Sequence, residues 1–167
     1  MNLTKLIPLL MVAGTGANAH ADVFISEYIE GSSNNKAIEL YNAGDASVNL
    51  GDYSLNIYFN GSESASVNLT LSGEIASGET YVIGHTQAGS EIASVANLMA
   101  TIGFNGDDTV VLSNGAGDFI DVVGQIGFDP GSRWSSNGVS TQNASLRRKS
   151  NIEGGDVNAV DDFDPSL

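Results

Sequence analysis

The chain has 167 residues, enough for one domain with a hydrophobic core, and it contains no cysteine. Disulfides are therefore excluded, and core packing or a bound metal must hold the fold. The net charge of −14 favours solubility and the uptake of cations, and on average it repels nucleic acid.

Residues 1–21 are predicted to be a secretory signal peptide. Lys5 precedes a short apolar run that leads into small residues around Ala19 and Ala21. Cleavage fits after either alanine, and we favour Ala21 because a clean strand pattern follows. The run is too short to span a bilayer, and no later run approaches that length. We therefore expect a secreted, extracellular or cell-surface protein with no membrane span after the signal peptide.

Residues 23–42 predict a strand, a loop and a second strand. Two runs of β-formers, 23–30 and 37–42, flank six turn-prone residues. In the second run Ile38 and Leu40 alternate with polar residues, so one face of this strand is expected to be apolar.

Further strand patterns recur at short intervals after residue 50. Segments 53–59 and 65–71 predict one hairpin, and 109–112 and 119–123 predict another. The second hairpin is almost continuously apolar, as expected for central strands covered on both sides. Other predicted strands cover 79–83 and 144–149, and residues 91–99 predict a loop with one helical turn.

About eight or nine short strands imply an all-β fold, an antiparallel sandwich or barrel. We expect residues 22–150 to form this one domain. Residues 151–167 are acidic and contain few large apolar side chains, so they predict an extended strap or a linker.

The sequence contains no convincing catalytic set. Its two histidines are His20, near the predicted cleavage site, and His85, at the end of a predicted strand. A lone histidine supplies no arrangement of base and nucleophile, and adjacent carboxylates on a strand point in opposite directions. We therefore expect no catalytic residue in this chain.

Two oxygen-rich segments are candidate calcium sites. One contains Asn105, Asp107 and Asp108, and the other contains Asp156, Asn158 and Asp161. Neither matches the twelve-residue calcium loop, and capping of turns by Asp and Asn explains both without a metal. No cofactor is required by these patterns, and calcium is the metal they would accept.

A basic island lies in the C-terminal third. Arg147 and Lys149 would share one face of a strand, whereas Arg148 would point to the other face. With Arg133 and Trp134, the exposed pair could contact nucleic-acid phosphates with aromatic help. The alternative is that these cations pair with carboxylates and that Trp134 plugs the end of the sandwich.

Several segments resemble lamin-tail domains. They include Phe24–Tyr28, Ala37–Asn42, Val48–Leu55, Ile75–Ile83, the hairpin from Asn105 to Gly124, and Ser140–Lys149. The resemblance covers nearly all of residues 22–150 and implies an immunoglobulin-like β-sandwich. Within this shared pattern, Glu27, Glu39 and Tyr41 are interpreted as polar groups that set strand register.

The closing segment, residues 155–166, resembles the junction that follows the lamin-tail domain in large bacterial extracellular nucleases. In those proteins the domain lies behind a signal peptide and precedes an endonuclease/exonuclease/phosphatase domain. That catalytic domain uses a divalent metal (magnesium, manganese or calcium), and its residues have no counterpart here. The resemblance therefore implies a piece of a longer protein.

We accordingly expect a non-catalytic module that positions a secreted nuclease through contact with extracellular DNA, with the downstream catalytic domain or with a surface partner. Arg133, Trp134, Arg147 and Lys149 are the candidates for DNA contact. The alternative is a structural or adhesive module that binds protein or glycan through its loops and is stiffened by calcium.

Overall fold

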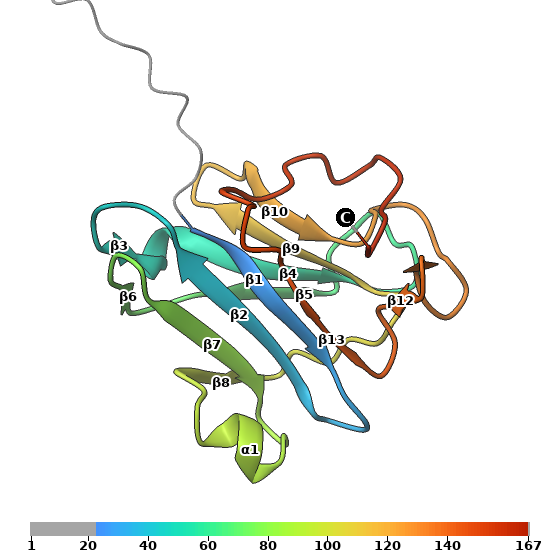
Figure 1. Cartoon of the computed structure of the whole chain (residues 1–167), viewed down its shortest axis with the longest axis horizontal. Coiled ribbons are helices and arrows are strands. Elements are labelled where there is room, and N and C mark those ends of the chain that lie inside the picture. The colour runs from blue at the N-terminus through green and yellow to red at the C-terminus, as the bar shows by residue number, and fades with distance from the viewer. Residues whose placement is uncertain (1–22, 167) are drawn as a thin grey trace, which may run out of the picture.

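The computed structural model describes residues 23–166, which form two β-sheets that pack face to face (Figure 1). The predicted signal peptide lies outside these residues. The elements in chain order are β1 (Val23–Glu30), β2 (Lys36–Asn42), β3 (Val48–Asn49), a 3₁₀ turn η1 (Leu50–Asp52), β4 (Tyr53–Tyr58), β5 (Val67–Thr70), β6 (Glu74–Ile75), β7 (Thr80–His85), α1 (Ser90–Ala93), β8 (Leu98–Ala100), β9 (Thr109–Asn114), β10 (Phe119–Val123), β11 (Ser135–Ser136), β12 (Val139–Ser140) and β13 (Ala144–Arg147). None of the helices in this part of the chain is long and apolar enough to cross a bilayer.

The larger sheet contains five strands in the order β13-β1-β2-β7-β8. All neighbours are antiparallel except β7 and β8, which are parallel. The strand, loop and strand predicted for residues 23–42 are confirmed as β1 and β2. On β2, Ile38 and Leu40 are fully buried, whereas Glu39 and Tyr41 are half-buried, so the predicted apolar face is also confirmed.

The smaller sheet contains four strands in the order β10-β9-β4-β5. Both predicted hairpins are present, as β4 with β5 and as β9 with β10. Together the two sheets hold nine strands, in agreement with the predicted eight or nine, and residues 23–166 add four two-residue strands that pair separately. The predicted helical turn is α1, and the short edge strand β8 that follows it was not predicted.

The core lies between the two sheets. Its largest fully buried side chains come from both sheets and the loops between them, and they include Ile38, Leu40, Leu55, Ile57, Ile83, Ile102 and Leu112. Each such side chain contributes about 1.5–3 kcal/mol by leaving water. With no cysteine in the chain, this packing is what the two sheets rely on.

One prediction about β10 is wrong. Its apolar sequence indicated a central strand, but β10 is the edge strand of the smaller sheet. The outer face of this sheet is nevertheless covered, because Val111 and Val122 pack against Ala159 from the C-terminal segment. The apolar run therefore reflects burial of both faces of β10. Such burial does not require a paired strand along both of its edges.

Residues 151–166, here called the strap, run along the smaller sheet beside β10 (Figure 1). The backbone N–H of Ile126 donates to the Ala159 carbonyl at 2.7 Å, and the Gln125 side chain donates to the Val160 carbonyl at 3.0 Å. Phe163 packs against the main core. The strap is thus fastened to the sandwich at several points along its length.

Candidate functional site

Asp121 and Arg148 form a buried connection between the two sheets. Asp121 lies in β10, and Arg148 directly follows β13. Arg148 Nη2 lies 2.6 and 2.8 Å from the two carboxylate oxygens of Asp121, and Arg148 Nε donates to the Ile25 carbonyl at 2.9 Å. Arg148 therefore connects β1 of the larger sheet to β10 of the smaller one.

Backbone N–H groups complete the shell around Asp121. Those of Ile25 and Asp156 donate to its carboxylate at 2.7 and 2.8 Å, and that of Val122 donates at 2.9 Å. Burial raises the pKa of Asp121, and the Arg148 guanidinium and these N–H groups offset part of that rise. One carboxylate thereby joins β1, β10, the residue after β13 and the strap.

Arg147 and Lys149 lie on the opposite, exposed face, as strand alternation predicts. The Arg147 side chain is 76% exposed and pairs with Glu27 across the strands at 3.0 Å. Hydrogen bonding to Glu27 raises the pKa of Arg147. Lys149 Nζ donates to the Ser166 carbonyl at 2.9 Å, so this cation also fastens the strap.

Arg133 and Trp134 differ in exposure. Arg133 is exposed, and its Nη1 donates to Gln142 at 2.9 Å. Trp134 is only 6% exposed, and its ring packs edge-on against the Phe163 ring, with 5.6 Å between the ring centroids. The interpretation of Trp134 as a DNA contact is therefore corrected, because a buried indole has no face free to stack on a base. Instead it packs beneath the strap.

A cavity of about 600 Å³ lies where the strap faces β13. Its walls come from β1, β10, β12, β13 and the strap, and its apolar part includes Val123, Leu146 and Phe163. Carboxylates of the strap and the cations Arg147 and Lys149 share its lining. The basic island thus lies at a groove of mixed charge rather than on a uniformly positive surface.

The candidate calcium residues of the strap act as turn caps. Asp156 Oδ1 accepts from the N–H of Asn158 at 2.9 Å, and Asn158 Oδ1 accepts from that of Val160 at 3.4 Å. Asp161 is exposed and lines the cavity. Within residues 23–166, no group of three or more His, Cys, Asp or Glu side chains is arranged to hold a metal.

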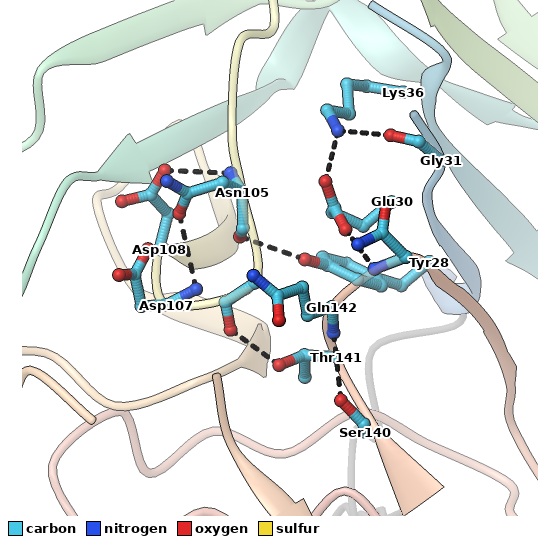
Figure 2. A network of polar contacts seen from close by, with 12 residues as sticks. Tyr28, Glu30, Gly31, Lys36, Asn105, Asp107, Asp108, Ser140, Thr141 and Gln142 are labelled. Atoms are coloured by element: carbon cyan, nitrogen blue, oxygen red, sulfur yellow. Dashed lines mark hydrogen bonds and ion pairs between the residues drawn. The ribbon is translucent and has the colours of Figure 1, made fainter. Parts of the chain in front are cut away.

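The other candidate segment, Asn105–Asp108, is a tight turn before β9 (Figure 2). Asp108 accepts from the backbone N–H groups of Asn105 and Asn60, both at 2.9 Å. Burial raises the pKa of Asp108, and the nearby carboxylates of Asp107 and Asp129 add to the rise. Figure 2 also shows Tyr28 reaching the turn, where its hydroxyl donates to the Asn105 carbonyl at 3.1 Å.

To the side of this turn, near Tyr28, lies a buried ion pair that was not predicted from the sequence. Lys36 pairs with Glu30, and Glu30 also accepts from the backbone N–H of Asn143 (Figure 2). His85 ends β7 as predicted, and its Nδ1 accepts from the N–H of Gln87 at 3.0 Å. Both arrangements hold turns at the ends of strands.

Asp121 was also missed as a site residue. The available signal was a single carboxylate within an otherwise apolar run, Phe119–Val123. A buried carboxylate requires a cation or several donors. Arg148, already predicted to point away from Arg147 and Lys149, was the suitable cation.

Two face-to-face sheets with this strand order define an immunoglobulin-like β-sandwich. The family model described as Lamin Tail Domain matches residues 16–127. The chain therefore belongs to the lamin tail domain family, whose immunoglobulin-like fold is non-catalytic. No curated protein matches the sequence. Because β13 and the strap lie outside the matched residues, the Asp121–Arg148 pair joins the matched part to the segment that follows it.

Proposed function

We propose that this chain is the non-catalytic lamin-tail module of a secreted nuclease that degrades extracellular DNA, and that it positions the enzyme by contact with the catalytic domain. Membership of the lamin tail domain family supports the module assignment. The resemblance of residues 155–166 to the junction in bacterial extracellular nucleases supports the choice of enzyme. The signal-peptide pattern of residues 1–21 supports export.

The observation that carries the positioning role is the fastening of the strap. Asp121 binds its beginning through the N–H of Asp156, and Lys149 binds its end through the Ser166 carbonyl. A segment held at both ends is a poor flexible linker. A domain connected through it would be kept at one side of the sandwich, near β10 and the groove.

Direct DNA contact is the second candidate, and the exposure of Arg147 favours it. An exposed ion pair such as Arg147–Glu27 is screened by water and contributes little, so Arg147 could exchange Glu27 for a phosphate at little cost. Lys149 and Arg133 would add further phosphate contacts. The net charge of −14 opposes this version.

DNA binding by residues 22–167 across a salt series separates the two versions. Contact with the catalytic domain predicts no binding to double-stranded DNA at low salt. DNA contact predicts an affinity that falls steeply with salt, and that falls further in the double variant Arg147→Ala with Lys149→Ala. The matched control, Ser72→Asp with Ser94→Asp, lowers the net charge equally at exposed positions and should leave such binding nearly unchanged.

The reading frame beyond Leu167 tests the nuclease assignment itself. A metal-dependent nuclease domain is expected there. With that domain prepared separately, NMR titration of residues 22–167 should shift signals from the strap and β13. A frame without a nuclease domain would overturn the assignment, and shifts confined to the β2–β7 face would place the contact elsewhere.

A further inference from the structure

An uncompensated carboxylate oxygen is buried in the Asn105–Asp108 turn. Asp107 is 7% exposed, and within residues 23–166 its Oδ1 atom has no hydrogen-bond partner. Burying an ionised carboxylate without a partner is costly, and proteins pair such groups or use them to coordinate metals. This atom is therefore available for a ligand that the protein itself does not supply.

The surroundings of Asp107 are also negative. Asp108 is 5% exposed, and both carboxylates lie on the same side of the turn, away from the Tyr28 ring (Figure 2). Asp129 adds another negative charge near Asp108. The ion pairs of the described residues lie elsewhere and join Lys36 to Glu30, Arg147 to Glu27 and Arg148 to Asp121. A cation from solution would balance the charge of this turn.

We propose that the turn binds a calcium ion through Asp107 Oδ1 and the neighbouring Asp108 carboxylate. Calcium takes six to eight oxygen ligands in flexible geometry, whereas magnesium requires near-ideal octahedral geometry. This calcium site is separate from the positioning role and does not depend on it. The turn is a better candidate than the strap segment Asp156–Asp161. The side-chain oxygens of that segment are exposed, and none of them is buried without a partner.

Few protein atoms remain to complete the site. The Asn105 and Gly106 carbonyls already accept from Tyr28 and from the Thr141 hydroxyl, and Asn105 Oδ1 accepts from the N–H of Asp107. No third carboxylate in residues 23–166 completes a metal cluster. Water must therefore provide the other ligands, so the affinity belongs to the weak extracellular class, with a Kd of about 10⁻⁴–10⁻³ M.

The turn lies where calcium would stabilise the fold. Tyr28 connects it to β1, and Thr141 connects it to the segment before β13. Neutralising the turn would strengthen a junction between both sheets. Calcium at ten times its Kd should raise the melting temperature by about 3–6 °C.

Trp134 provides a direct optical test. It is the one tryptophan of the sequence, and its backbone N–H donates to the hydroxyl of Thr141, which in turn donates to the Gly106 carbonyl. Terbium, a luminescent substitute for calcium, should therefore emit when Trp134 is excited. Calcium should displace it at a much lower concentration than magnesium.

Matched variants locate the ion. Asp107→Asn should abolish the terbium emission and the calcium-dependent rise in melting temperature, without lowering the melting temperature in chelator. Asp156→Asn, in the other candidate segment, should change neither signal. The proposal is overturned if wild-type protein shows no calcium response beyond that of magnesium, a result that needs no variant to fold. It is equally overturned if the response persists in Asp107→Asn.

Discussion

Arg148 and Asp121 form a two-contact ion pair, at 2.6 and 2.8 Å, between the residue after β13 and the edge strand of the opposite sheet. Asp121 is completely buried, whereas the Arg148 side chain is 22% exposed. Because the carboxylate also accepts the N–H of Asp156, this pair fixes the start of the strap as well. The sandwich and the strap therefore share one buried charge, in addition to the packing of the core and the other contacts of the strap.

Replacing Arg148 should lower the free energy of unfolding much more than replacing its neighbour Arg147. Arg148→Ala leaves the Asp121 carboxylate buried without its cation, and we expect a loss of about 3–5 kcal/mol in the free energy of unfolding. Arg147→Ala removes an exposed pair that water already screens, and it should cost far less than Arg148→Ala. Urea denaturation measures both, and equal losses would contradict the structural role of Arg148.

Gly155 allows the strap to approach β10 closely. A Cβ at this position would lie 2.2 Å from the Ile120 carbonyl oxygen and 2.5 Å from the Asp121 Cβ. Gly155→Ala should therefore displace the strap and speed hydrogen exchange at the N–H groups of Asp156 and Ile126. Gly103→Ala is the control, because a Cβ there meets nothing within 4 Å. Identical exchange in the two variants would refute this close packing.

Phe163 should shield Trp134 from water. Its ring packs edge-on against the indole, so Phe163→Ala opens the cavity beneath the strap. We expect a red shift of tryptophan fluorescence and a loss of about 1–3 kcal/mol, below the cost at a fully buried site. Phe128→Ala removes an exposed ring and should alter neither quantity. An unchanged emission spectrum in Phe163→Ala would show that the strap does not cover Trp134.

Much of the sandwich could be predicted because its strands alternate locally. Ile38 and Leu40 identify the buried face of β2 from four neighbouring residues. The position of β10 at a sheet edge could not be predicted in this way. Its outer face is covered by Ala159, which lies far along the chain and carries too small a side chain to produce a periodic signal.

The candidate sites illustrate the same limit. Strand alternation placed Arg147 and Lys149 correctly on one face, but Trp134 is buried because Phe163 covers it, a contact between residues distant in sequence. The oxygen-rich turn was visible as Asn105, Asp107 and Asp108. That Asp107 Oδ1 lacks a donor depends on the packing around it, which the sequence does not display.

The end of the strap should loosen in acid. The N–H and hydroxyl of Ser166 donate to Asp164 and lower its pKa from the ordinary value of 3.8. A lowered pKa in the folded state means that this stabilisation is present above pH 3.8 and is lost as pH falls through the folded pKa. NMR titration should place the Asp164 midpoint below 3.8. Ser166→Ala should move the midpoint upward, and an unmoved midpoint would exclude the hydroxyl as a cause.

If the proposed longer nuclease is confirmed, its activity tests the positioning role most directly. A flexible glycine–serine insert of about ten residues after Ser166 leaves residues 23–166 intact but releases the orientation of the next domain. The proposed role predicts that kcat/KM for long double-stranded DNA falls several-fold, while hydrolysis of a small phosphodiester is unchanged. Equal rates on long DNA with and without the insert would contradict it.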